Sequence, residues 1–316
     1  MDWAGVMDTA VTSRPMIESD PSEPEQLLRD RYDEHGYLFL RDVLPASEVL
    51  ALRHDILRLL DGQGWIDRDH PLTDGVVDHD GFARTPDDVV RHKGLVVGEQ
   101  VYGQIYRLES FHRLAHHPNL LLACRALLGS EVLVHPRTIA RVMIPSPRVH
   151  ATPAHQDFIH VQGSATCVTS WIPLGDCPRD LGSLTILAGS HRDGVLSYRE
   201  ALGAGDIEAH LCDRGHTWHE ADLAAGDILL FNSLTVHRAL ENRTGDRIRL
   251  SVDYRYQPAD EPVDQGTLAP HVGICTWEQA YQDWPADSEL RYFWRDAAPE
   301  VSPWDEELRW QKDQIC

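Results

Sequence analysis

Apolar and polar positions divide the chain into a helix-rich first part and a strand-rich second part. Apolar residues recur at helical spacing over residues 25–35, which predicts a helix that ends at Gly36. The short apolar run at residues 37–40 is typical of a strand. Further apolar stripes predict helices over about residues 45–60 and 114–128.

Between residues 131 and 256, short β segments alternate with turn signals, which favours a mainly β core with flanking helices. Many short strands at such spacing are typical of a sandwich, a barrel or a jelly roll. Residues 193–219 interrupt the pattern and are expected to form an excursion. The expected β segments are residues 131–144, 166–173, 183–187, 226–231 and 247–256.

Segments without a clear period complete the predicted organisation. Residues 1–24 are polar and contain several prolines, so we expect a loose segment. Residues 61–98 favour a long surface loop of the kind that often shapes a binding site. The expected single domain covers residues 25–316, and its parts are a helical flank (25–130), the core (131–256) and a C-terminal extension (257–316).

The C-terminal extension is unusually rich in tryptophan. Large aromatic side chains are costly to leave in water. We therefore expect them to pack across the core or against the partner subunit of a homodimer. They are Trp277, Trp284, Trp294, Trp304 and Trp310.

Charge and hydropathy restrict the classes of partner. Fifty acidic against 29 basic residues give the 316-residue chain a formal net charge of −21, which argues against nucleic acid and anionic lipid. No apolar run approaches the ~18–20 residues of a membrane span, and the N-terminus does not resemble a secretory signal. We expect a cytoplasmic protein with a small-molecule substrate and neither nucleic acid nor membrane as a partner.

The first candidate for chemistry is the pair His155 and Asp157. On an extended strand, residues two apart face the same side, so the imidazole and the carboxylate would point together. They would supply two of the three ligands of the facial triad that binds non-haem Fe(II). In isolation, a buried His–Asp hydrogen bond is the commoner explanation of such a pair.

A third ligand follows downstream. Residues 226–232 form a turn and an apolar strand, and a tight corner then leads to His237 at the start of the next strand. A jelly roll can bring this histidine beside His155 and Asp157. Two histidines and one carboxylate leave three octahedral positions of the metal open, as a bidentate cosubstrate and O₂ require.

Arg249 and Ser251 follow on the next β run and face one side of it. A guanidinium binds a carboxylate bidentately, and a hydroxyl adds one donor, which suits the distal carboxylate of 2-oxoglutarate. Arg247 lies on the same face and is a rival anchor. Arg137 and Arg141 share a strand face before the His–Asp pair, where either can contact the cosubstrate or an acidic substrate.

Other polar residues have competing interpretations. His216 and His219, with Cys212 nearby, suggest zinc, but no second ligand pair accompanies them. His160, beyond the His–Asp pair, is a surface residue or faces substrate. His191 is expected in a turn, bonded to backbone.

These residues resemble the phytanoyl-CoA dioxygenase family, over roughly residues 37–256. The resemblance implies a double-stranded β-helix flanked by helices, Fe(II), 2-oxoglutarate and usually hydroxylation, with Trp171 lining the cosubstrate pocket. The spacing from His237 to Arg249 is a residue longer than the family pattern, which keeps Arg247 in consideration. The matching features are His155-Gln156-Asp157, Trp171, Asp176, residues 182–184, residues 189–192, residues 226–237, Asn242 and Arg249.

We therefore predict an Fe(II)- and 2-oxoglutarate-dependent dioxygenase that hydroxylates an unactivated C–H bond of a small or medium-sized metabolite. A composition rich in Arg, Asp and Ala favours secondary metabolism. In related halogenases a small residue replaces the carboxylate ligand, so Asp157 disfavours halogenation. The alternatives are a non-catalytic jelly-roll binding protein and a cupin-like metalloenzyme without an oxoacid. Arg249 with Ser251 discriminates against both, because only a 2-oxoglutarate user needs them.

Overall fold

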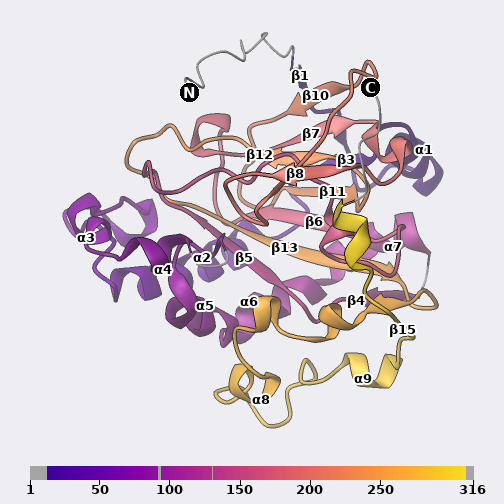
Figure 1. The fold of residues 1–316 in the computed structure, drawn as a ribbon. Coiled ribbons are helices and arrows are strands. Elements are labelled where there is room, and N and C mark those ends of the chain that lie inside the picture. The colour runs from indigo at the N-terminus through magenta and orange to yellow at the C-terminus, as the bar shows by residue number, and fades with distance from the viewer. Residues whose placement is uncertain (1–12, 92–93, 130, 311–316) are drawn as a thin grey trace.

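The computed structural model describes residues 13–91, 94–129 and 131–310, the side chains of residues 309 and 310 excepted. Two β-sheets face each other across an interior (Figure 1). The larger sheet has the order β2 (Glu18–Ser19), β3 (Tyr37–Leu40), β11 (Ile228–Asn232), β6 (Val168–Pro173), β13 (Arg249–Pro258) and β4 (Val132–Val134), with β5 (Ile139–Met143) also paired to β13. The smaller sheet has the order β1 (Arg14–Pro15), β10 (Thr217–Glu220), β7 (Leu184–Ala188) and β12 (His237–Ala239).

The larger sheet has two apolar faces because side chains alternate along each strand. In β11, Ile228 and Leu230 pack on the side that the helices cover, whereas Leu229 and Phe231 pack toward the smaller sheet. Ile186 of the smaller sheet completes this second cluster. The predicted mainly β core of jelly-roll type is confirmed.

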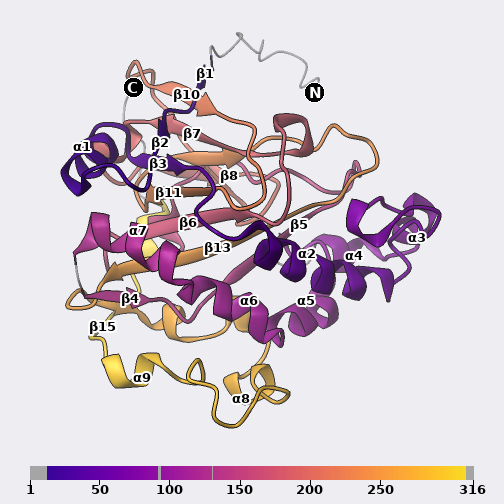
Figure 2. The same ribbon diagram turned by 180° about the vertical axis from the view of Figure 1, so that it is seen from behind.

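Helices cover the outer face of the larger sheet, and Figure 2 shows them in front of its strands. The helices predicted over residues 25–35 and 45–60 are confirmed as α1 and α2, and the third is shorter than predicted and forms α7. The helices of this layer are α1 (Glu25–His35), α2 (Ala46–Asp61), α5 (Gly98–Tyr106), α6 (Glu109–Arg113) and α7 (Pro118–Leu128).

The residue that ends α1, Gly36, must be a glycine for two physical reasons. Its φ of 77° lies in the left-handed region, which glycine adopts without steric cost. A Cβ at this position would also lie 2.4 Å from His191 Nδ1 and 2.6 Å from Thr235 Oγ1. His191 itself lies in a 3₁₀ turn, where its Nε2 is 3.1 Å from the carbonyl oxygen of Asp33, as predicted for a turn residue.

Three segments that were predicted to lie outside the regular elements contain helices or strands. Residues 61–98 are not a surface loop: they contain the short helices α3 (His79–Ala83) and α4 (Asp87–Arg91), and Trp65, Phe82 and Val90 are buried. Local periodicity missed them because each helix has only five residues. The loose-segment prediction is likewise wrong for β1 and β2, and residues 1–12 lie outside the described chain. The excursion at residues 193–219 carries β8 (Tyr198–Glu200), β9 (Ile207–Ala209) and the start of β10.

The C-terminal extension packs onto the helical layer (Figure 1). Trp277, Trp284 and Trp294 are buried in the same apolar cluster as α5 and α6, and α9 (Trp294–Ala297) also contacts β4. The Trp310 side chain lies outside the described residues. The elements of this extension are β14 (Val263–Asp264), α8 (Trp277–Ala280), α9 (Trp294–Ala297) and β15 (Val301–Ser302), with short 3₁₀ turns at Gln265–Leu268, His271–Gly273 and Glu306–Trp310.

Among the described residues, no helix is long and apolar enough to span a bilayer.

Replacing Trp284 by alanine should destabilise the protein strongly. The indole Nε1 donates to the carbonyl oxygen of Arg107 at 2.8 Å, and its ring centroid is 5.0 Å from that of His112. Removal of a buried tryptophan costs about 3–5 kcal/mol, measured as the free energy of unfolding in urea. The control Leu122→Ala, at a residue that is 64% exposed, should change this free energy by at most ~0.5 kcal/mol. Equal losses would contradict the packing role.

Candidate metal centre

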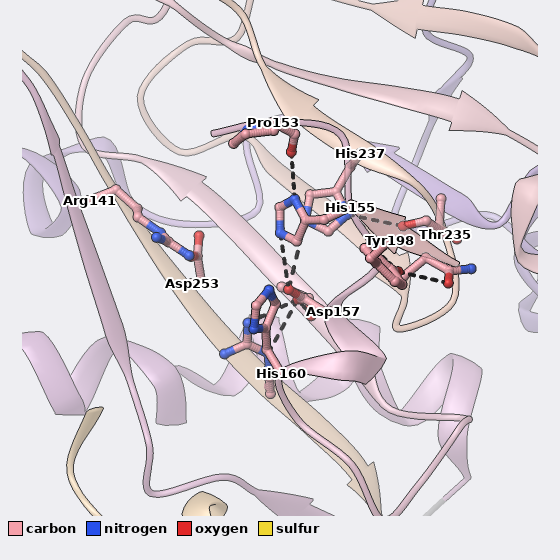
Figure 3. Close-up of polar contacts among 12 residues, drawn as sticks. Arg141, Pro153, His155, Asp157, His160, Tyr198, Thr235, His237 and Asp253 are labelled. Carbon is pink, nitrogen blue, oxygen red and sulfur yellow. Dashed lines mark hydrogen bonds and ion pairs between the residues drawn. The ribbon is translucent and has the colours of Figure 1, made fainter. Parts of the chain in front are cut away.

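A backbone bridge brings the two candidate histidines together. His155 N donates to the carbonyl oxygen of His237 at 2.9 Å, and His237 N donates to that of His155 at 2.9 Å. The two residues are far apart in sequence, yet this antiparallel pair holds their ring centroids 4.2 Å apart. Figure 3 shows the two rings side by side.

Asp157 lies beside the two histidines, but its backbone conformation differs from the predicted one. It begins a 3₁₀ turn, Asp157–Ile159, because its carbonyl oxygen accepts from the N–H groups of His160 and Val161. The prediction of an extended strand through this residue is therefore wrong. Its carboxylate nevertheless faces both histidines: Asp157 Oδ1 is 3.7 Å from His155 Nε2 and 3.8 Å from His237 Nε2.

The histidines are set up as ligands through Nε2. His155 Nδ1 lies 2.8 Å from the carbonyl oxygen of Pro153, and His237 Nδ1 lies 3.0 Å from that of Thr235. A carbonyl only accepts, so each Nδ1 carries the proton and each Nε2 keeps its lone pair. Burial and the neighbouring His155 lower the pKa of His237 to about 3, which keeps this ring neutral.

Asp157 is held by two further residues that the sequence did not point to. Its Oδ2 accepts from Thr169 Oγ1 at 2.5 Å and pairs with the Arg255 guanidinium, whose Nη2 is 3.0 Å away. Burial alone would raise the pKa of the Asp157 carboxyl, but the Arg255 guanidinium holds that pKa well below its usual range. Alternation along β13 was the available signal, because Arg249, Ser251 and Arg255 all occupy the same strand face.

The three side chains fit a divalent iron. One ligand atom of each lies within 4.8 Å of the others, and all three residues are buried; within the described ranges no other such group occurs. The Nε2–Oδ1 separations are too long for hydrogen bonds. Two neutral imidazoles and an ionised carboxylate are the ligand set of non-haem Fe(II) oxygenases.

The zinc alternative does not assemble. His216 Nε2 is 2.8 Å from the carboxylate of Asp193, and His219 Nδ1 is 2.8 Å from the hydroxyl of Tyr37. The two histidines therefore have separate partners.

Arg249 and Ser251 lie on one face of β13, and Arg249 Nη1 donates to Ser251 Oγ at 2.6 Å. Arg249 also lines a narrow cleft that reaches His155, Asp157 and His237. Trp171 lines the same cleft, with its ring centroid 5.9 Å from the Arg249 guanidinium carbon. Arg247 precedes β13 and is exposed.

A larger cavity of about 680 Å³ opens on the other side of His155 and Asp157. Arg141 lines both this cavity and the cleft, and its Nε pairs with Asp253 Oδ2 at 3.0 Å (Figure 3). His160 also lines the cavity.

The family model of phytanoyl-CoA dioxygenase (PhyH) matches residues 32–251. The chain belongs to this family. Among curated relatives, the 1-deoxypentalenic acid 11-beta-hydroxylase of Streptomyces arenae is 26% identical over 284 residues, which cover 84% of this chain and 92% of the relative. The ectoine dioxygenase of Halomonas elongata is 27% identical over 237 residues, covering 69% and 65%.

Solved structures share the fold. The epimerase SnoN from nogalamycin biosynthesis, in complex with Fe³⁺, alpha ketoglutarate and nogalamycin RO, superposes with a TM-score of 0.53 at 22% identity, over 76% of this chain and 85% of that one. A second structure of SnoN superposes with a TM-score of 0.52 at 23% identity, over 76% of this chain and 84% of that one. The PhyH-family chain thus has the cupin-like double-stranded β-helix. It is an Fe(II)- and 2-oxoglutarate-dependent dioxygenase that uses O₂ as its second cosubstrate.

Replacing Arg255 by leucine should weaken iron binding. The substitution removes the cation that holds Asp157, and loss of a group that orients a metal ligand typically costs roughly 10–100-fold in metal affinity. The measurement is the Fe(II) dissociation constant of the anaerobic protein, by competition with a chromogenic chelator.

Two variants control for this experiment. Arg255→Lys keeps the charge and should retain more of the affinity. Arg148→Leu removes an arginine that pairs with Asp87 away from the triad and should leave the constant unchanged. A folded Arg255→Leu protein with wild-type affinity would show that Arg255 does not support the metal site.

Proposed function

We propose that this dioxygenase hydroxylates an unactivated C–H bond of a small or medium-sized metabolite, in the setting of secondary metabolism. One observation carries the proposal: the triad lies between a narrow cleft that ends at a buried arginine and an open cavity of about 680 Å³. Ligand sites for small molecules usually enclose ~300–1,000 Å³. The cleft suits the cosubstrate and the cavity suits the substrate.

We assign the distal carboxylate of 2-oxoglutarate to Arg249 and Ser251. Arg249 is buried, and its Nε lacks a hydrogen-bond partner among the described residues. Burial lowers the pKa of this guanidinium, which expresses the cost of a cation held away from water. A carboxylate in the cleft would offset that cost with a charge-assisted hydrogen bond. Arg247 lies outside the cleft and is set aside as the anchor.

The remaining cleft residues orient the cosubstrate and exclude water. Trp171, Leu184 and Phe231 line it with apolar surface. Such surface strengthens the ionic contact at Arg249, because electrostatic interactions grow as water is removed. Arg141 stands at the junction of cleft and cavity, so it can contact either ligand.

Iron held by His155, Asp157 and His237 would supply the oxidising chemistry, with O₂ and 2-oxoglutarate as cosubstrates. In the net reaction one oxygen atom of O₂ enters the substrate as a hydroxyl group and the other enters succinate, and CO₂ is released. The protein's own part is to hold the ligands, orient the cosubstrate and present one C–H bond of the substrate from the cavity.

The relatives support hydroxylation as the reaction type, since one is named a hydroxylase and another a dioxygenase. Their named compounds differ, so neither compound is transferred to this chain. Neither a non-catalytic binding protein nor a metalloenzyme without an oxoacid would explain why Arg249 is buried without an ion pair to any described acidic residue. A cytoplasmic location and a homodimer stay predictions.

Replacing Arg249 by alanine should raise the requirement for 2-oxoglutarate far more than Arg247→Ala does. Loss of a buried charge-assisted hydrogen bond costs about 2 kcal/mol or more, which corresponds to roughly 30-fold in KM for 2-oxoglutarate. The measurement is succinate release against 2-oxoglutarate concentration. Arg247→Ala, which removes an exposed side chain, should stay within about twofold of the wild type. Equal or reversed effects would mean that the anchor is assigned to the wrong arginine.

A further inference from the structure

The larger cavity contains an arginine, Arg137, that lies outside the cleft assigned to 2-oxoglutarate. Arg137 lies two residues before β5, and it lines the cavity together with Ile139 and Arg141. The three occupy alternate positions of the chain, as expected for side chains that leave one face of a strand. Arg137 therefore projects toward the cavity that borders His155 and Asp157.

One edge of the Arg137 guanidinium is unengaged. Its Nη1 donates to the carbonyl oxygen of His160 at 3.3 Å, which is the single hydrogen bond that Arg137 makes with the described residues. Its Nε is buried and lacks a partner in that same part of the chain. The edge formed by Nε and Nη2 is one that can bind a carboxylate through two parallel hydrogen bonds.

No neighbouring carboxylate among the described residues forms an ion pair with Arg137. Asp264 also lines the cavity and attracts the guanidinium electrostatically, but its oxygens accept hydrogen bonds from the backbone N–H and the hydroxyl of Thr267, at 3.1 and 2.6 Å, and none from Arg137. No ion pair joins Arg137 to any described acidic residue. The other two guanidiniums of the cavity differ in this respect, because Arg141 pairs with Asp253 and Arg255 pairs with Asp157.

The chain leaves room at this guanidinium. Gly266 faces both it and Asp264: a Cβ there would lie 2.8 Å from Asp264 Oδ1, 3.3 Å from Arg137 Nη2 and 3.4 Å from Nη1. Most side chains at residue 266 would therefore crowd the guanidinium. Glycine keeps the approach to it open from the cavity.

The other cavity walls are partly apolar. Ile139, Val161, Ala269 and Val272 line it, and Trp304 of the C-terminal extension contributes as well. A ligand that fits these walls combines an apolar body with one anionic group. A single unpaired guanidinium balances a monoanion better than it balances a phosphate dianion.

We propose that the cavity binds an organic acid, whose carboxylate pairs with the Arg137 guanidinium while its apolar body runs toward the iron ligands. This inference rests on the proposed function, since it assigns the substrate class of the same site. Arg137 is a specificity-determining residue in this arrangement. The net charge of −21 opposes approach of an acid only weakly, because salt screens exposed charges beyond about 8 Å.

The test compares carboxylic acids with their own neutral amides. The probes are decanoate, adamantane-1-carboxylate and 2-naphthoate, each paired with its carboxamide. Calorimetric titrations use the full-length protein under anaerobic conditions, with Fe(II) and saturating 2-oxoglutarate so that Arg249 is occupied. In each sample, the visible charge-transfer band of the Fe(II)–2-oxoglutarate complex reports that the metal and cosubstrate sites are intact.

We expect the wild type to bind at least one acid about tenfold or more tightly than its amide. Arg137→Leu should reduce that preference to within about twofold and retain the band. Arg137→Lys, which keeps the charge but not the paired donors, should give an intermediate preference and guards against misfolding of the leucine variant. Arg243→Leu, at an exposed residue, should behave as the wild type.

Other outcomes overturn the inference. If the band forms but the wild type binds no acid, or binds acids and amides equally, the acid subsite fails and the proposed function stands. If folded Arg137→Leu loses the band, Arg137 serves the cosubstrate and not the substrate. If the wild type gives no band, the proposed function fails together with the inference.

Discussion

The antiparallel bridge between His155 and His237 is the constraint on which the metal site depends. Two backbone hydrogen bonds of 2.9 Å fix residues that are distant in sequence, so the ring positions are set by the backbone before any metal binds. Gln156 stabilises the chain between the two ligands of residues 155 and 157, because its side-chain nitrogen Nε2 donates to the carbonyl oxygens of Gly194 and Leu234. The two histidine ligands are therefore preorganised by the main chain, which keeps the cost of binding a metal low.

Strand β13 links this site to the stability of the whole domain. Its outward residues, such as Val252 and Tyr254, belong to the core that the helices cover. Its inward residues include Arg249, Asp253 and Arg255, which are buried polar groups of the site. The strand pairs with β4, β5 and β6, so Arg255, which holds Asp157, and Arg249, which lines the narrow cleft, lie on one rigid element.

Local pattern was enough for much of this arrangement and insufficient for the rest. Strand 37–40 and the helix before it were predicted because their periodicity is local. The metal ligands were identified from a His–Asp pair that is followed downstream by a histidine after an apolar strand. The 3₁₀ turn at Asp157 was missed because it also depends on a distant residue: Phe158 N donates to the carbonyl oxygen of Ser233 at 3.0 Å. The contacts of Thr169 and Arg255 with Asp157 likewise depend on strand register between β6 and β13, which a single sequence does not specify.

Titration of the anaerobic metal-free protein, first with Fe(II) and then with 2-oxoglutarate, tests the metal site and the cleft together. We predict that the charge-transfer band appears at one equivalent of each and is lost in His237→Ala. Binding of iron without the band would contradict the assignment of the cleft to 2-oxoglutarate. A protein that binds no iron, or a band that survives in His237→Ala, would contradict the triad itself.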